Sequence, residues 1–387
     1  MKQIDRKQDI LDVAVEMIAR KGIEFTIAEI AAAADVTDSV LYHYYKNKED
    51  LLFQAAGEHL KAGVRELSRH LKGITEPTER LRKFIWFQLF YHDTNSRYAD
   101  FTIFECRSKI QFFSHDSFQY FREWSRLLRE ILEDGQKAGA FPDELNLLVV
   151  RDMILGLLDM ENILYLTGLQ KEDARKDLDE IWALLNPLLT DTSRSPADKY
   201  TRIWKAAEEV FAREGFDHAT ISEISRAARV AEGTIYDFFP NKQELLFSIM
   251  RARLGQHLNS LEELFSVKTP LRKLRRFVRH HYSVYLSRPA FTKAFILNGI
   301  FNREFYQSDV YSDFVKYLHM LDRILDEGKS DGSIRSSVNN RIFRNLFVGA
   351  FSHLALRWLV VGKAARFDKT AEINEVVELL TTAVALR

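Results

Sequence analysis

Hydrophobic residues recur along the chain at the spacing of an α-helix, three or four positions apart. The segment from Ile10 to Ile18 illustrates the pattern, because Ile10, Val13, Ala14 and Met17 share one face of a helix. No segment alternates apolar and polar residues between hairpin turns, as a half-buried strand would. The pattern therefore predicts an all-α fold.

The helical pattern occurs twice. A segment that begins at Thr26 has a counterpart that begins at Thr220. The residues that recur 194 positions later are Thr26, Glu29, Val36, Tyr42, Asn47, Lys48 and Phe53. Farther along, residues 133–141 are echoed by residues 326–334 at a shift of 193. A repeat that covers nearly the whole chain predicts two tandem copies of one unit.

Two capping boxes mark the start of a short helix in each copy. The hydroxyls of Thr26 and Thr220 are expected to accept a backbone N–H, while the acids three positions on, Glu29 and Glu223, reach back to the backbone. In the first copy the short helix ends at a turn that begins at Asp35, and a second short helix follows. This order predicts a helix-turn-helix, whose second helix can enter the major groove of DNA.

A longer helix follows in each copy, with Asn47 and Asn241 as its expected N-caps. An acidic residue three positions on, Asp50 in the first copy, is expected to complete a second capping box. Lys48 and Lys242 stand at the positive end of this helix, where a cation is unfavourable without an anion. They are candidates for DNA phosphate contacts, and the alternative is a solvated lysine.

These motifs resemble the DNA-binding region of the TetR family of bacterial transcriptional regulators. The resemblance rests on residues 230–242 (VAEGTIYDFFPNK) with Glu244-Leu245-Leu246, and on residues 36–48 (VTDSVLYHYYKNK) with Leu51-Leu52. The second copy is a near-complete match. The first departs from it at Ser39 and Val40, which replace Gly233 and Thr234.

The resemblance implies a set of DNA-contacting residues in each copy. Contacts to the phosphate backbone, which position a protein without reading sequence, would come from Thr26, Tyr42, Lys48, Thr220, Tyr236 and Lys242. Base reading would come from Asp38, Ser39, Val40 and His43 beside Thr37, and from Glu232, Gly233, Thr234 and Asp237. Because the two sets differ, the copies are expected to read different bases.

Local charge is less favourable for DNA binding. The formal charge is minus one between Thr26 and Lys48 and zero between Thr220 and Lys242, which is not the basic stripe of a tight nonspecific binder. We therefore expect moderate affinity and a weaker first copy. A helical protein-interaction scaffold with weak or lost DNA binding in one half is the alternative.

Roughly 130 residues of helical pattern follow each helix-turn-helix. In the TetR family this region is a six-helix bundle that binds a small molecule and dimerises through its last two helices, here within residues 143–189 and 338–386. The domains implied are two DNA-binding domains, two ligand-binding and dimerisation bundles, and a linker. The DNA-binding domains are residues 1–47 and 197–241, the bundles are residues 48–190 and 242–387, and the linker is residues 191–196. A six-residue linker reaches only about 20 Å, so the copies should be close neighbours.

The middle of each bundle is rich in aromatic residues, which form helical cores and also line apolar ligand sites. The residues expected to line a pocket are Phe87, Tyr91, Phe104, Tyr120, Trp124, Tyr282, Phe295, Phe301 and Phe314. Residues 288–328 resemble the subgroup that senses fatty acids or their acyl-coenzyme A esters, which implies an effector of this kind. Asp159 and Glu161, on an apolar helix, either contact a polar group of the ligand or face the partner bundle.

Composition agrees with a packed, cytoplasmic protein. The 387 residues are 46% hydrophobic and 28% charged, and Cys106 is the single cysteine, so an internal disulfide and a cysteine-ligated zinc site are excluded. The charged N-terminus does not resemble a signal peptide, and the apolar segments 147–166 and 342–361 carry charges that argue against membrane spans. Basic and acidic residues number 55 each, so the net charge neither supports nor excludes nucleic-acid binding.

An enzyme is the main alternative from another functional class. The sequence carries no Walker loop, G-x-G-x-x-G after a strand, H-E-x-x-H or G-x-S-x-G motif, and we expect no catalytic residue, metal or cofactor. We expect a repressor that binds a duplex DNA operator and is released by a small apolar effector. Two unequal copies predict either an intrachain pseudo-dimer on an asymmetric operator or an ordinary homodimer.

Overall fold

The computed structural model describes residues 6–22, 24–190, 199–214, 216, 218–249, 268–362 and 368–386. Within these ranges the regular structure is helical apart from one isolated bridge between Ile334 and Ala385, so the all-α prediction is confirmed. The predicted linker, residues 191–196, lies outside the described residues. In the same ranges no helix is both long enough and apolar enough to cross a membrane.

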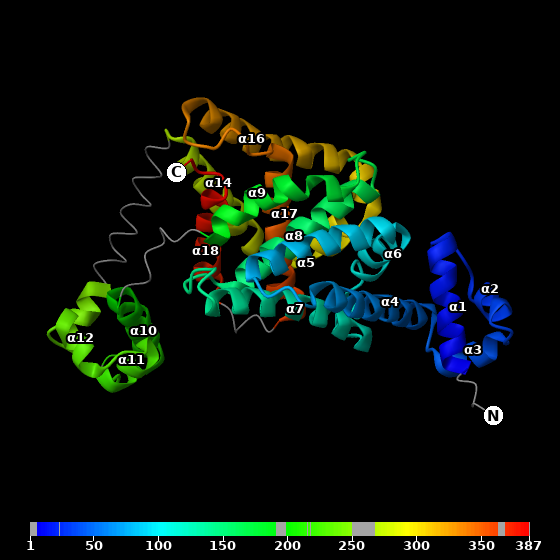
Figure 1. Cartoon of the computed structure of the whole chain (residues 1–387), viewed down its shortest axis with the longest axis horizontal. Helices are drawn as coiled ribbons and strands as arrows, with labels where there is room; N and C mark the ends of the chain where they lie inside the picture. Colours follow the sequence, from blue (N-terminus) through cyan, green and yellow to red (C-terminus); the bar gives the residue numbers. More distant parts are fainter. Residues whose placement is uncertain are drawn as a thin grey trace.

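Each copy begins with three helices. They are α1 (Arg6–Lys21), α2 (Ile27–Ala33) and α3 (Asp38–Tyr44) in the first copy, and α10 (Lys199–Glu214), α11 (Ile221–Ala228) and α12 (Glu232–Phe238) in the second. The long α4 (Lys48–Leu71) follows α3, and residues 242–249 are helical after α12. Figure 1 shows these two three-helix units at opposite ends of the molecule.

The α-helices of the two bundles follow one order, which agrees with the tandem duplication, whereas the short 3-10 and π helices between them differ. In the first copy they are α5 (Pro77–Thr94), α6 (Ser96–Asp100), η1 (Phe101–Cys106), η2 (Ile110–Ser114), η3 (Asp116–Phe118), α7 (Gln119–Lys137), α8 (Leu147–Leu166), η4 (Ala174–Asp177) and α9 (Leu178–Thr190). In the second they are α14 (Pro270–Leu286), α15 (Pro289–Phe295), η5 (Ile296–Ile300), η6 (Arg303–Gln307), α16 (Asp309–Asp331), α17 (Asn340–Leu356), η7 (Arg357–Val361) and α18 (Lys369–Thr382). Asn146 and Asn339, 193 positions apart, are the N-caps of the matching helices α8 and α17.

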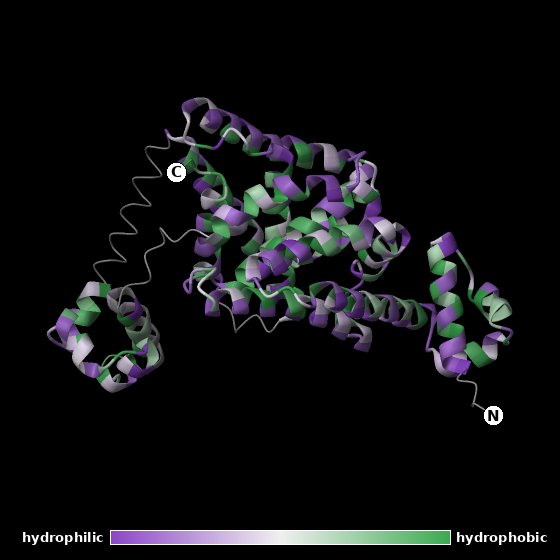
Figure 2. Ribbon diagram, in the orientation of Figure 1, coloured by the Kyte–Doolittle hydropathy of each residue, from purple (hydrophilic) through white to green (hydrophobic). Residues whose placement is uncertain are grey.

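The two bundles share one hydrophobic core. A single cluster of buried hydrophobic residues runs from α1 through the first bundle into α17 and α18 of the second. Figure 2 shows hydrophobic residues gathered on the central helices, with polar residues on the outer ones. The unit α10–α12 has a separate, smaller core around Ile203, Ile224 and Ile235.

The two bundles meet where α8 crosses α17. A Cβ atom placed on Gly156 would lie 2.1 Å from the carbonyl oxygen of Gly349, and one placed on Gly349 would lie 2.2 Å from the carbonyl group of Gly156. Only glycine permits backbones to approach this closely. Because the two glycines are 193 positions apart, they are equivalent residues, and the crossing relates the copies by an approximate twofold axis.

We expect Gly156→Ala and Gly349→Ala each to lower the free energy of unfolding by about 3 kcal/mol, since the added methyl group must push two helix backbones apart. Urea denaturation followed by circular dichroism measures the change. Gly233→Ala is the matched control, because this helical glycine has open space at its Cβ position. An equal, small effect of all three substitutions would contradict the close crossing.

Candidate functional site

The first short helix of each helix-turn-helix begins with the predicted capping box. The Thr26 backbone N–H donates to the Glu29 carboxylate over 2.6 Å, and the Thr220 N–H donates to Glu223 over 3.0 Å. Both boxes are reciprocal, because the threonine hydroxyls accept the backbone N–H of the glutamates. The turn after each helix passes through left-handed backbone at Asp35 (φ 53°) or Arg229 (φ 54°). The capping box thus fixes where the first short helix begins, and the left-handed residue turns the chain toward the second.

The outward faces of α3 and α12 are free of protein contacts that would bury them. Leu41 and Ile235 anchor the helices in their cores and are fully buried. Tyr42 and Tyr236 are 51% and 52% exposed. Of the other predicted DNA contacts, Thr234, Lys48 and Lys242 are half-buried and the rest are exposed: Thr26, Thr37, Asp38, Ser39, Val40, His43, Thr220, Glu232, Gly233 and Asp237. Two faces are therefore available to a duplex.

Lys48 and Lys242 have intramolecular partners that the sequence did not predict. Lys48 Nζ donates to the Phe25 carbonyl oxygen over 2.7 Å and lies 5.0 Å from the centre of the Phe25 ring. Lys242 Nζ donates to the carbonyl oxygens of Phe216 and Ala219 over 2.6 and 2.9 Å. Each lysine therefore ties its long helix to the loop before the helix-turn-helix.

One expected capping box differs from the structure. Asn47 and Asn241 do cap their helices by accepting the N–H of Asp50 and Glu244, each over 2.8 Å. The Asp50 carboxylate, however, accepts the backbone N–H of Lys46, so the prediction that it returns to Asn47 is wrong. The carboxylate reaches one residue farther back than a capping box requires.

A cavity of about 550 Å³ lies in the first bundle, within the size range of small-molecule sites. Helices α4 to α8 of the first copy line most of it, and α17 and η7 of the second copy complete its wall with His353, Leu356 and Arg357. Two of the predicted pocket residues, Tyr91 and Trp124, line it. Trp124 donates its indole N–H to Gln88, another lining residue, over 3.0 Å.

The other predicted pocket residues lie outside this cavity. They are Phe87, Phe104, Tyr120, Tyr282, Phe295, Phe301 and Phe314. Most of them pack in aromatic clusters of the core: the Phe87 ring lies 5.5 Å from Tyr91, and the Tyr282 ring lies 5.3 Å from Phe351. Aromatic spacing alone does not separate the side of a helix that faces a cavity from the side that faces other helices.

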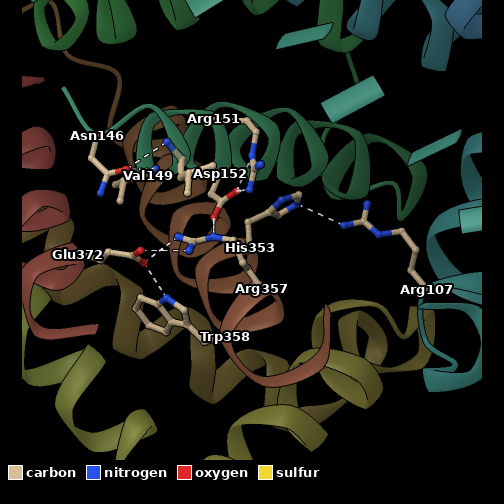
Figure 3. A network of polar contacts seen from close by, with 10 residues as sticks. Arg107, Asn146, Val149, Arg151, Asp152, His353, Arg357, Trp358 and Glu372 are labelled. Carbon is tan, nitrogen blue, oxygen red and sulfur yellow. Dashed lines mark hydrogen bonds and ion pairs between the residues drawn. The ribbon is translucent and has the colours of Figure 1, made fainter. Parts of the chain in front are cut away.

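Charged groups from both copies meet in the cavity wall. Asp159 accepts a hydrogen bond from Arg107 over 2.5 Å and one from His353 Nε2 of the second copy over 2.6 Å. Figure 3 shows Arg357 of the second copy between Asp152 and Glu372. Burial opposes ionisation of Asp159, but Arg107 and His353 outweigh it and hold its pKa well below the usual range.

Glu161 faces the second copy and not the cavity. This fully buried carboxylate accepts hydrogen bonds from Arg341 over 2.6 Å and from Asn345 over 2.9 Å. Burial raises its pKa despite these partners. The acids of α8 were expected either to contact a ligand or to face the partner bundle. Glu161 faces the partner bundle, whereas Asp159 both contacts that bundle and lines the cavity.

The cavity is connected to the first helix-turn-helix unit through α1. Tyr98 lines the cavity and donates its hydroxyl to the Val15 carbonyl oxygen of α1 over 2.7 Å. His59 of α4 stacks on Tyr98 with ring centres 3.8 Å apart. Arg97 donates to the Ala19 carbonyl oxygen at the end of α1 over 3.0 Å. A molecule that displaces Tyr98 would therefore act directly on α1.

Arginines border one side of the cavity. Arg122, Arg126 and Arg129 line it from α7, and their spacing of four and then three residues puts them on one face of that helix. Arg151 lines it from α8. An apolar interior beside several guanidinium groups suits a ligand with an apolar tail and an anionic head.

Comparisons with known proteins agree with the duplication. The family model described as "Bacterial regulatory proteins, tetR family" matches residues 10–55 and 203–249, and the model "YsiA-like protein, C-terminal region" matches 57–186 and 250–383. The chain is 31% identical over 193 residues to the fatty acid metabolism regulator protein of Bacillus subtilis (strain 168), covering 48% of this chain and 95% of that protein.

Two solved structures of regulators are similar to part of this chain. The transcriptional regulator FadR from Bacillus subtilis, solved in complex with stearoyl-CoA, is 26% identical with a TM-score of 0.40, and the match covers 44% of this chain and 93% of that one. The fatty acid degradation regulator FadR from Bacillus halodurans is 26% identical with a TM-score of 0.42, covering 50% and 99%.

Histidines in the cavity wall should make stability depend on pH. Desolvation lowers the pKa of His59 to about 3 and that of His92 to about 4, so these rings stay neutral while the unfolded chain takes up protons below its pKa of about 6.5. Stability should fall as the pH drops from 6.5 to 4, by up to about 1.4 kcal/mol per pH unit for each histidine. Urea denaturation of His92→Gln at several pH values should show a shallower slope than the parent, and identical slopes would contradict the assignment.

Proposed function

This chain belongs to the tetR family of bacterial regulatory proteins, carries the family unit twice and is a ligand-responsive transcriptional regulator, and we propose that it represses transcription as a single-chain dimer. The observation that carries the proposal is the contact of equivalent helices α8 and α17 within one chain, between two units whose reading helices are exposed. The chain acts on DNA in the cytoplasm and catalyses no reaction.

Buried charges favour pairing of the first copy with the second. In three largely buried polar pairs between the copies, the first supplies the acid and the second the base: Asp152 with Arg357, Asp159 with His353, and Glu161 with Arg341. At a shift of 193 the matching residues are uncharged: Asn345, Ser352 and Leu354 for the acids, and Leu164, Met160 and Leu148 for the bases. Pairing two like copies would break all three pairs, although Asp152, Asp159 and Arg357 would keep a charged partner in their own copy. Glu161 and Arg341 would lose the charged partner that each has in the other copy, at a cost of about 3–5 kcal/mol for this pair.

The effector we propose is a long-chain fatty acyl-coenzyme A or the free fatty acid. The apolar cavity accepts the acyl chain, and Arg122, Arg126 and Arg129 interact with the anionic head outside it. The Bacillus subtilis relative named for fatty acid metabolism supports this class of ligand.

Ligand and DNA favour different positions of α6 and α1 relative to each other. An acyl chain that needs the space of Tyr98 and His59 binds best when these rings move, which breaks the hydrogen bond from Tyr98 to Val15. The ligand therefore favours a state in which α1 and the reading helix α3 are displaced, and DNA favours the other state. The ligand therefore releases the protein from its operator, because ligand and DNA each bind best to a different one of the two states.

We expect one chain to bind a duplex with two unequal half-sites, because α3 and α12 present different residues. A duplex selected from a random pool provides the operator, and light scattering of the complex should give one 45.1 kDa chain per duplex. Two chains per duplex would contradict the single-chain dimer. A chain that selects no duplex would support the scaffold alternative.

The tyrosine hydroxyls test the phosphate contacts. Tyr42→Phe and Tyr236→Phe should each weaken operator binding about tenfold, whatever the bases, since a hydrogen bond to a charged group contributes about 1.5–3 kcal/mol. Fluorescence anisotropy measures the dissociation constants. Tyr120→Phe on α7 is the control and should leave them unchanged; equal affinity of all three variants would remove the tyrosines from the interface.

Stearoyl-CoA should weaken operator binding at least tenfold, whereas coenzyme A alone should not, because it lacks the acyl chain. An Arg122→Glu, Arg126→Glu double variant should bind the operator normally and lose the response. Lys137→Glu, at the exposed end of the same helix, should keep it. If stearoyl-CoA leaves the anisotropy titration of the parent protein unchanged, the proposed effector is wrong.

A further inference from the structure

The two copies differ in the space available at the ligand site. His92 and Thr102 line the cavity of the first copy. At a shift of 193 the second copy has Tyr285 and Phe295, which are larger. The replacements occupy the positions from which the first copy's cavity is formed.

Ring contacts in the second copy show how these larger residues pack. Phe295 lies 5.4 Å from Tyr285 and 5.6 Å from Phe314, measured between ring centres. His281, which matches the lining residue Gln88, lies 4.4 Å from Phe351. These distances are direct contacts between rings. These aromatic side chains therefore pack against one another at positions whose counterparts line the cavity of the first copy.

The second copy also lacks the arginine face. The positions that match Arg122, Arg126 and Arg129 of α7 are Val315, His319 and Asp322 of α16. Arg344, which matches the lining residue Arg151, is paired with the Asp322 carboxylate. At the matched positions that the structure describes, residues 268–362, the second copy thus has larger aromatic residues in place of the open space and lacks the row of three arginines.

We propose that one chain binds a single molecule of its anionic, apolar-tailed effector, in the first copy only, and that the second copy has become part of the wall of that site. His353, Leu356 and Arg357 of α17 and η7 line the first cavity, so one molecule contacts both copies. This inference rests on the proposed function for the nature of the ligand. Its central claim, one open site and one filled site, is independent of which lipid binds.

Native mass spectrometry of the full chain with excess stearoyl-CoA should show one ligand per chain. Thr102→Phe, which places the second copy's residue in the first cavity, should weaken binding at least tenfold and leave the melting temperature nearly unchanged, because the ring enters open space. Phe295→Thr should bind one ligand with the parent affinity and melt several degrees lower, because it removes a packed ring from the second copy.

Two ligands per chain would overturn the inference and leave the proposed effector intact. One ligand that binds Thr102→Phe as tightly as the parent would also overturn it, because the site would lie elsewhere. If stearoyl-CoA does not bind at all, the proposed effector fails and the melting temperatures still decide the inference: an equal loss for Thr102→Phe and Phe295→Thr would refute the difference between open and filled sites.

Discussion

The contact between Gly156 and Gly349 is the constraint on which the rest of the structure depends. Because the backbones of α8 and α17 touch there, the side chains on either side of the crossing are brought within hydrogen-bond distance across the two copies. The same contact inserts His353 and Arg357 into the wall of a cavity that belongs mainly to the other copy. The ion pairs between the copies thus depend on one close approach, which also completes the wall of the cavity.

Duplication within one chain explains why the two halves differ so strongly around this crossing. In a homodimer every substitution appears on both sides of the interface, and a buried acid would need a base at the position that it contacts on the identical partner. Here Glu161 meets Arg341 and Asn345, and no symmetric counterpart limits either side. The acids of α8 and the bases of α17 are consistent with substitutions made in one copy and compensated in the other.

Local motifs allowed much of the fold to be predicted from the sequence. The capping boxes at Thr26 and Thr220, and the N-caps at Asn47 and Asn241, involve residues three positions apart, so a linear pattern contains their geometry. The duplication needed only self-comparison. These features do not depend on how distant helices pack.

Tertiary features were predicted less well, for physical reasons. Phe295 and Tyr91 are both aromatic residues of a bundle, yet only Tyr91 lines the cavity, because Phe295 packs against Tyr285 and Phe314 of the second copy. The acceptors of Lys48 and Lys242 are backbone carbonyl oxygens, which carry no sequence signal. Asp159 was singled out as a charge on an apolar helix, and that signal did identify a group of the cavity wall.

The pairing of α8 with α17 inside one polypeptide has a consequence for a cell that makes few copies of the protein. Ordinary dimers separate on dilution, since association is a second-order process, whereas partners joined by a chain meet at an effective local concentration that dilution does not change. The two bundles of this chain therefore remain together however scarce the protein is.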